Sequence, residues 1–343
     1  MYIIGTVGPT VKDRTALKGI VDNGVNALRF NFAHGSDNEF FGFLQMAREI
    51  KDDVNIILDI SGTKIRISNK FQYIYKVYNN EEVIFCGEDQ YEKIRADLKD
   101  IRIKIFPLNI KSNILCRNDF DKISIKDNTM IFQITSKEKN LIRARAVKGG
   151  IIRKGKGCNI KDFDRSMLSI SKKDRKAIIW GIKNNVDIIC QSFVESREDV
   201  MAIKQFISAH KNENTHIKIW AKIETLKGVD NVDEIIDEAD GVVIGRGDLI
   251  PETSIEDTPV YEERIIEKVS KIENKDIIIA THLFNSMKLG KMPYLSEVES
   301  VYNFIRKGVT GFLLAGETSV GKAPIKTVQF LRKLVSKYEM NIE

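Results

Sequence analysis

Eight short apolar runs, rich in β-branched residues, recur along the chain, and each is followed by a loop and a helical pattern. The runs are residues 2–7, 26–32, 54–60, 186–193, 216–224, 241–245, 276–281 and 311–316. The helical patterns lie near 12–23, 37–50, 172–184, 196–210, 230–238, 258–273, 295–307 and 324–338. Continuous apolar runs that alternate with helices are typical of parallel strands covered on both faces. Eight such units predict an α/β fold, a (β/α)8 TIM barrel.

One long gap interrupts this rhythm after the third strand. From about residue 67 to 160 the pattern changes to short alternating stretches separated by turn residues such as Asn79-Asn80. We expect a small antiparallel β domain over 67–157, inserted into a barrel formed by 1–66 and 158–343. The loops at the carboxyl ends of barrel strands carry the active site, so this domain lies at the catalytic end.

Charge and cysteine usage exclude several classes of protein. The formal net charge is +6 over 343 residues, and lysines alternate with acidic residues, so no nucleic-acid-binding stripe is predicted. The four cysteines form no C-x-x-C pair, which favours free thiols in a reducing compartment. The sequence has no signal-peptide pattern and no run of 18 apolar residues. We therefore expect a cytoplasmic protein that binds neither nucleic acid nor membrane.

Polar residues gather where the predicted strands end. In chain order they are Asn31, Asp59, Lys222 with Glu224, Asp248, Thr281 and Glu317, and Arg29 shares the face of Asn31. Any one of them alone is equally well explained as an ordinary loop salt bridge. Charged groups inside a barrel are costly unless they are paired, metal-bound or functional, so the whole set at one mouth predicts an active site.

Two of these carboxylates suit a divalent cation. Mg²⁺ is typically held by one or two carboxylates together with substrate oxygens and water, which Glu224 and Asp248 would provide. Lys222 would stabilise charge on a transferring group or an enolate. The segment from Gly245 to Asp248 ends a strand and opens a helix, where backbone N–H groups would hold a carboxylate or phosphate.

Other candidate motifs are weaker. Residues 316–323 nearly form a phosphate-binding P-loop, but Ala323 stands where Ser or Thr is required, so a tight turn is the better interpretation. Among the histidines, His34 and His282 fall on the catalytic face. Cys190 lies within the fourth strand and is better explained as a packed thiol than as a nucleophile.

Several segments together resemble the pyruvate kinase family. They include Arg29-Phe-Asn-Phe-Ala-His-Gly35, Leu58-Asp59 with Gly62 and Ile65-Arg66, Lys156-Gly-Cys-Asn159, Lys222-Ile-Glu224, Arg246-Gly-Asp-Leu249 and Gly316-Glu-Thr318. The similarity runs from residue 2 to about 338 and covers a catalytic barrel with its lid. It implies no C-terminal allosteric domain after the barrel, and hence no activation by sugar phosphates.

The resemblance implies a role for each matching residue. Lys222 would stabilise the transferring phosphoryl group and the developing enolate, and Glu224 and Asp248 would bind Mg²⁺ or Mn²⁺. Arg29 would contact the phosphate of phosphoenolpyruvate, and Gly247, Asp248 and Thr281 would hold its carboxylate. The nucleotide, ADP or ATP, would lie beside Pro9, His34, Arg66 and Lys156.

The chain departs from the family pattern at the monovalent-cation site. That site would align with Asn31, Ala33, Asp59 and Ile60, so a serine hydroxyl ligand is missing. Lys64 stands where potassium-dependent members carry Glu, as in members that do not need potassium. We therefore expect no requirement for K⁺. Further departures, whose effect on the reaction is open, are Thr225 and Leu226 after the Lys-Ile-Glu motif, Ile250, His282 and Leu295.

The resemblance favours a phosphotransferase that converts phosphoenolpyruvate and ADP to pyruvate and ATP. Two alternatives stay open at this stage: another enzyme on the same metal–enolate site (an aldolase, decarboxylase or biosynthetic enzyme), and a non-catalytic module. The sequence leaves open the phosphoryl acceptor, the pathway and the regulation. A homodimer through barrel helices is compatible with the sequence, which gives no interface.

Overall fold

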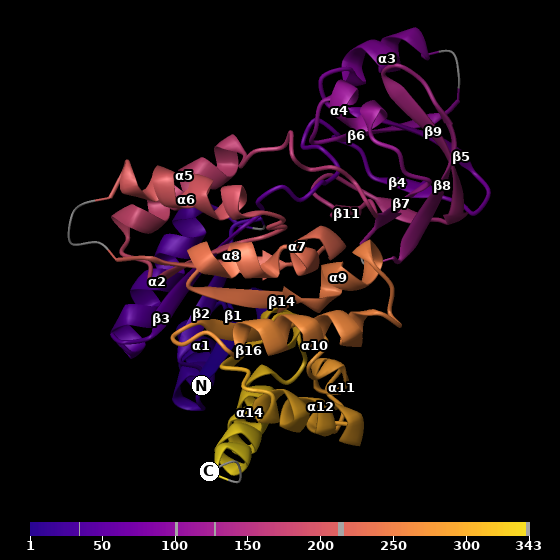
Figure 1. Cartoon of the computed structure of the whole chain (residues 1–343). Helices are drawn as coiled ribbons and strands as arrows, with labels where there is room; N and C mark the ends of the chain where they lie inside the picture. Colours follow the sequence, from indigo (N-terminus) through magenta and orange to yellow (C-terminus); the bar gives the residue numbers. More distant parts are fainter. Residues whose placement is uncertain (34, 100–101, 127, 212–215, 341–343) are drawn as a thin grey trace. The chain divides into compact units, whose positions relative to one another are not determined.

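A computed structural model describes residues 1–33, 35–99, 102–126, 128–211 and 216–340 of the chain (Figure 1). The chain divides into two compact units. The barrel unit comprises Met1–Gly62, Ile170–Gly247 and Asp257–Glu343, and the lid unit comprises Thr63–Ser169 and Asp248–Glu256. The segment that follows the sixth barrel strand thus belongs to the lid unit from Asp248 onward.

Eight parallel strands form a closed barrel in the barrel unit. They are β1 (Tyr2–Thr6), β2 (Ala27–Asn31), β3 (Asn55–Ile60), β12 (Ile188–Gln191), β13 (Lys218–Ile223), β14 (Gly241–Gly245), β15 (Asp276–Ala280) and β16 (Gly311–Leu314). Each predicted run supplies one strand, so the predicted (β/α)8 barrel is confirmed. Continuous apolar runs form these strands because both of their faces are buried.

Helices alternate with the barrel strands near the predicted positions. They are α1 (Arg14–Asp22), α2 (Asp37–Ile50), α5 (Lys172–Lys183), α6 (Arg197–Ser208), α7 (Leu226–Asp230), α8 (Val232–Glu238), α10 (Thr258–Val269), α12 (Leu295–Arg306) and α14 (Pro324–Glu339). The short helices are η1 (Pro9–Val11), α11 (Asn285–Lys288) and α13 (Gly316–Ser319), and α9 (Arg246–Glu252) follows β14. The helix expected at 230–238 is preceded by the separate helix α7. Among the described helices, none is both long and apolar enough to cross a membrane.

The lid unit is built on two small sheets. The larger has the strand order β11 (Cys158–Asn159), β7 (Lys122–Ile125), β8 (Met130–Lys137), β9 (Leu141–Lys148), β5 (Glu82–Gly87) and β6 (Lys104–Leu108). The smaller pairs β4 (Tyr75–Val77) with β10 (Gly150–Ile152). The expected antiparallel pairing holds except between β5 and β6, which are parallel. Helix α3 (Tyr91–Asp97) lies between them in the chain, and a crossover connection of this kind permits parallel pairing. The alternating pattern did not predict α3 or α4 (Ser112–Arg117).

The barrel interior explains how the functional residues are placed. Ala27, Ile57 and Trp220 belong to a buried apolar cluster inside the barrel. Side chains two residues apart on a strand share a face, so Arg29, Asp59 and Lys222 continue the inward face toward the carboxyl end. Two residues further along each strand, charged side chains therefore replace the apolar ones inside the barrel.

Candidate active site

Asp59 lies between the two cations of the barrel interior. Its Oδ2 atom is 2.6 Å from Arg29 Nε and 2.8 Å from Lys222 Nζ, and its Oδ1 atom is 3.0 Å from Lys222 Nζ. Arg29 Nη1 also donates to Thr6 Oγ1 at 3.1 Å. All three charged side chains are largely or fully buried. Because buried charges need partners, the carboxylate stabilises both cations at the carboxyl end of the barrel.

This pairing sets the protonation states of the cluster. Burial by itself would raise the pKa of Asp59, but Arg29 and Lys222 outweigh it and lower the pKa to about 2. Burial would likewise lower the pKa of Lys222, but Asp59 and Glu224 raise it above its usual value. Lys222 is therefore a permanent ammonium at neutral pH, suited to stabilising negative charge and unsuited to donating a proton.

Ser192 is a member of this cluster to which the sequence analysis gave no role. It follows β12, and its hydroxyl accepts from Lys222 Nζ at 2.9 Å and donates to Asp59 Oδ1 at 3.3 Å. The signal was present in the sequence, because Ser192 lies two residues after Cys190, whose side chain joins the barrel core. Ser192 holds the ammonium of Lys222 from a second direction.

Glu224 lies buried just beyond β13. Its Oε2 atom accepts the backbone N–H of Phe193 at 2.9 Å, and Phe193 adopts a φ of 54°. Gly245, at the end of β14, lies against the carboxylate: a Cβ there would be 2.7 Å from Glu224 Oε1. Only glycine leaves space for this carboxylate at the end of the neighbouring strand.

The donor chemistry around Glu224 fits a hard divalent cation. The carboxylate is held by a backbone N–H and packed against Gly245, so its orientation is restricted. Within the described ranges, no group of three or more His, Cys, Asp and Glu residues is arranged to hold a metal. Mg²⁺ often takes one or two carboxylates and completes its shell with substrate oxygens and water. The assignment of Glu224 and Asp248 as the two carboxylates stays a prediction.

Thr281 follows β15 in a strained conformation. Its φ is 69°, a value that is rare for a β-branched residue, and the φ of the following His282 is 53°. Thr281 Oγ1 accepts the backbone N–H of Gly247 at 2.8 Å, and Arg246 Nε donates to the Thr281 carbonyl at 3.0 Å. Strain of this kind is frequent at ligand-binding positions. His282 Nδ1 lies 3.2 Å from Asn285 Nδ2.

Asp248 is held within the lid unit. Its Oδ2 atom lies 2.5 Å from Lys64 Nζ, and its Oδ1 atom accepts from Asn159 Nδ2 at 3.1 Å. Asn159 also donates to Glu252 Oε1 at 3.2 Å, which Arg165 Nη2 contacts at 2.9 Å. The sequence analysis assigned roles to Lys64 and Asp248 but not to Asn159, Arg165 or Glu252. Nothing in the strand-end pattern marks these three, because their pairing depends on tertiary structure.

The predicted nucleotide-side residues are distributed over both units. Pro9 opens η1 in the barrel unit. Arg66 and Lys156 belong to the lid unit, where Arg66 Nη1 donates to the Gly155 carbonyl at 3.2 Å. Burial, followed by Lys126 and Arg153, lowers the pKa of Lys156. His34 lies outside the described residues.

At the predicted remnant of the monovalent-cation site, polar atoms already have partners. Asn31 Oδ1 accepts the backbone N–H of Ala33 at 3.1 Å, and Asp59 holds the two cations described above. Ile60 ends β3, and its carbonyl accepts from Ser192 N at 3.1 Å. Lys64 contacts Asp248. The role of Lys64 as a replacement for K⁺ stays a prediction.

Some departures from the family pattern have a structural explanation. Thr225 caps α7, its hydroxyl accepting from Gly228 N at 3.1 Å. Leu295 begins α12 and is 72% exposed, and nothing in the structure explains it. Ile250 lies inside α9, and nothing in the structure explains it. Burial raises the pKa of Cys190 to about 12, which agrees with a packed thiol.

Comparison with known sequences decides the family. The family model for the barrel domain of pyruvate kinase matches residues 1–328. The chain belongs to the pyruvate kinase family. A pyruvate kinase of Clostridium perfringens is 30% identical over 99% of this chain and 70% of its own length. A pyruvate kinase of Thermotoga maritima is 30% identical, and the chain covers 71% of its length. A pyruvate kinase of Geobacillus stearothermophilus is 29% identical, and the chain covers 57% of its length. The barrel is thus that of a pyruvate kinase-like phosphotransferase. The chain spans little more than half of the length of some of these relatives.

Proposed function

We propose that the protein transfers the phosphoryl group of phosphoenolpyruvate to ADP, giving pyruvate and ATP. The observation that carries this proposal is the placement of Arg29 and Lys222 on one buried carboxylate at the carboxyl end of the barrel. Two fixed cations at this end suit a substrate whose phosphate is transferred and whose enolate oxygen becomes negative as it leaves. Phosphoryl transfer depends mainly on positioning and on neutralising charge, which these groups provide.

The two cations have different tasks. Arg29 presents a guanidinium fork, which matches the geometry of a phosphate group, and Asp59 holds its Nε atom in place. Lys222 stabilises negative charge on the transferring group and on the enolate oxygen that forms as the phosphorus–oxygen bond breaks. Since Lys222 stays protonated, the proton that converts the enolate to pyruvate comes from another donor.

Gly247 and Thr281 form the proposed contact for the substrate carboxylate. The Gly247 N–H is held by Thr281 Oγ1 at the start of α9, where backbone N–H groups favour an anion. Mg²⁺ or Mn²⁺, bound by Glu224 and Asp248, would offset the charge of the substrate oxygens. The metal dependence is part of the proposal.

The nucleotide is proposed to contact Pro9, His34, Arg66 and Lys156, and Lys156 is delivered when the lid unit closes over the substrate. Closure of a lid excludes water and prevents hydrolysis of the phosphoryl donor. Activity is proposed not to require K⁺, because Ala33 lacks a hydroxyl ligand and Lys64 supplies a positive charge. Kinetic measurements test the identity of the substrates, the requirement for a divalent metal and the independence from K⁺.

A direct test supplies phosphoenolpyruvate and Mg²⁺ with a panel of nucleoside diphosphates and measures pyruvate and nucleoside triphosphate separately. The proposal expects both products in equal amounts, with ADP among the acceptors. Pyruvate formed without a triphosphate would indicate hydrolysis, and no turnover with any acceptor would reject the phosphotransferase assignment.

A further inference from the structure

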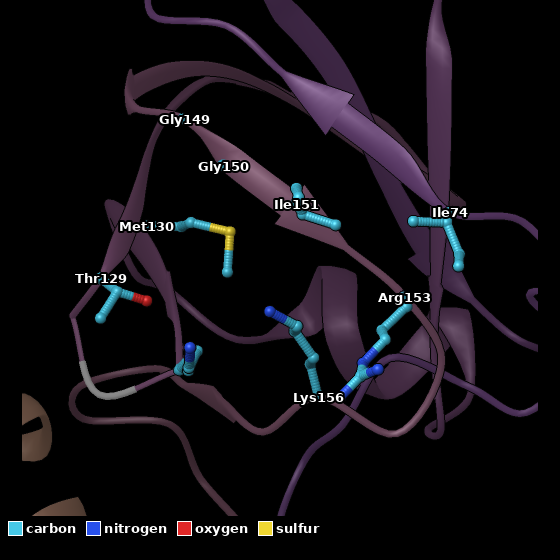
Figure 2. A pocket seen from close by; sticks show the side chains of 9 residues that line it. Ile74, Thr129, Met130, Gly149, Gly150, Ile151, Arg153 and Lys156 are labelled. Atoms are coloured by element: carbon cyan, nitrogen blue, oxygen red, sulfur yellow. The ribbon is translucent and has the colours of Figure 1, made fainter.

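Arg246 is a buried cation that lies beside the proposed carboxylate contact without belonging to it. It is the first residue of α9, and only 8% of its surface is exposed. The lid pocket in Figure 2, by contrast, contains Lys156, which the proposed nucleotide contact already includes. Because burial of a charge is unfavourable without partners, the contacts of Arg246 indicate what its guanidinium does.

The guanidinium of Arg246 has partners on three elements of the barrel unit. Its Nε atom donates to the Thr281 carbonyl at 3.0 Å, and its Nη2 atom donates to the same oxygen. The Nε atom also lies 3.9 Å from Glu262 Oε1 on α10, and the Cζ atom lies 5.4 Å from the centre of the Phe304 ring on α12. These contacts direct the guanidinium to the backbone of Thr281, so Arg246 is suited to act on a substrate through that residue.

Thr281 needs such support because its backbone conformation is unfavourable. A φ of 69° in a β-branched residue persists only where the surrounding contacts fix it. The Thr281 carbonyl accepts the two donors of Arg246, and Thr281 Oγ1 accepts the Gly247 N–H at 2.8 Å. Hydrogen bonds from a charged donor are stronger than neutral ones, and two of them on one oxygen fix the direction of this carbonyl. The Thr281 hydroxyl is thereby held beside the Gly247 N–H.

We propose that Arg246 is a positioning residue that makes the site selective for substrates that carry a carboxylate. By fixing the Thr281 backbone, it keeps the Thr281 hydroxyl and the Gly247 N–H together where the substrate carboxylate is proposed to bind. The place of that carboxylate rests on the proposed function, and the role of Arg246 in the preference for it is additional. A phosphate ester without a carboxylate would rely on Arg29 and Lys222 and would gain nothing from Arg246.

The first experiment compares phosphoenolpyruvate with vinyl phosphate, which is the same enol phosphate without its carboxylate. Calorimetry measures both affinities with Mg²⁺ and without nucleotide, and the natural protein should prefer phosphoenolpyruvate. Arg246→Lys keeps the charge but loses the paired donors, so it should weaken phosphoenolpyruvate by about fivefold and vinyl phosphate by less than about twofold. General damage to the fold would weaken both ligands alike. An unchanged ratio of the two affinities in Arg246→Lys, or a natural protein without the preference, would overturn the proposal.

Arg48 on α2 provides a matched control at the amino end of the barrel strands. Its Nη1 atom donates to the Val54 carbonyl at 3.0 Å, just before β3 begins, so it too is an arginine bound to a main-chain carbonyl. Arg48→Lys should leave the affinities for both ligands unchanged. A selective loss of phosphoenolpyruvate affinity in Arg48→Lys would contradict a role that is specific to Arg246.

A double-mutant cycle tests whether Arg246 acts through Thr281. Thr281→Ala removes the hydroxyl and should by itself weaken phosphoenolpyruvate binding by about fivefold. Because the hydroxyl is then absent, adding Arg246→Lys should weaken binding by less than a further twofold or so. Losses that multiply in full in the double variant would overturn the proposal.

The binding measurements do not depend on turnover, so the two proposals fail separately. Selective binding of phosphoenolpyruvate without turnover on any acceptor would reject the phosphotransferase assignment and leave the role of Arg246 intact. Normal turnover in a protein whose selectivity does not change in Arg246→Lys would reject the role of Arg246 and leave the phosphotransferase assignment intact.

Discussion

At the scale of single residues, Asp59 is the shared partner of the two cations in the candidate active site. A buried carboxylate is unfavourable alone, and two buried cations are equally unfavourable without it. Together they form a cluster in which Lys222 keeps its charge in a low-dielectric interior, where that charge acts most strongly on a bound substrate. The cluster also contains Ser192, so four side chains from four strands or strand ends depend on one another.

Replacing Asp59 by Asn should alter the response of stability to acid. The folded pKa of about 2 lies below the unfolded value of 3.8, so the carboxylate contributes stability above pH 3.8 that is lost as the pH falls toward 2. This contribution is on the order of 2 kcal/mol. The free energies of unfolding of the natural protein and of Asp59→Asn should therefore converge between pH 4 and pH 2. A constant difference across this range would contradict the assigned pairing.

The same variant should change the alkaline side of the pH–rate profile. Without Asp59, burial and Arg29 would both lower the pKa of Lys222. The rate of Asp59→Asn should then fall at a lower pH than that of the natural protein. Conservative replacement by Glu serves as the control, and an unchanged alkaline limb in Asp59→Asn would contradict this account.

At the scale of elements, the connection after β3 requires glycine. Gly62 has a φ of 56°, and a Cβ there would lie 2.0 Å from the Ser192 carbonyl oxygen. Gly62→Ala should lower the free energy of unfolding by more than about 2 kcal/mol, because the backbone of two barrel segments must move. Gly42 on α2 is the matched control, since nothing lies within 4 Å of its added Cβ. In chemical unfolding, Gly42→Ala should raise the free energy of unfolding by up to about 1 kcal/mol. Equal effects of Gly62→Ala and Gly42→Ala on this free energy would contradict the requirement for glycine at position 62.

The buried pair of Arg165 and Glu252 lies within the lid unit, where Glu252 is the last residue of α9. Burial raises the pKa of Glu252 to about 7 although Arg165 opposes it. Arg165→Met should lower the free energy of unfolding by about 3–5 kcal/mol at alkaline pH, where the Glu252 carboxylate lacks its cationic partner. Arg165 lowers the pKa of Glu252, so its removal should raise that pKa further above about 7, and the difference in stability between the natural protein and the variant should grow as the pH rises above 7. Adding Glu252→Gln should remove this pH dependence, and its persistence in the double variant would contradict the pairing.

Some of these elements and contacts could be predicted from the sequence, and others could not. Barrel strands and helices follow from apolar runs and from signals such as Asn23-Gly24, where Gly24 has a φ of 126° and α1 ends as expected. Arg29 and Lys222 follow from strand-end position together with period-two alternation, and Asp59 follows from its position at a strand end. The partners Asn159, Arg165 and Glu252 do not, because residues far apart in sequence meet only after folding. The parallel pair in the lid was missed because alternation does not encode strand direction.

At the scale of the whole molecule, turnover should not need K⁺. Two positive charges about 4 Å apart repel by about 4 kcal/mol at an effective dielectric constant of 20, so K⁺ and the Lys64 ammonium would exclude each other. The natural protein should be equally active in K⁺- and NH₄⁺-free buffer at matched ionic strength. Lys64→Glu, combined with Ala33→Ser to restore a hydroxyl ligand, should gain K⁺ dependence. Strong stimulation of the natural protein by K⁺ would refute the idea.

The most direct test of the central claim replaces Lys222 by Met and measures phosphoryl transfer from phosphoenolpyruvate to ADP. Lys218→Met is the control, because Lys218 lies on the same strand, where its Nζ atom pairs with Asp276 at 3.0 Å. We expect Lys222→Met to lose at least about 100-fold in turnover while still binding phosphoenolpyruvate, and Lys218→Met to stay active. A Lys222→Met variant that keeps more than about a tenth of the natural turnover would contradict the account.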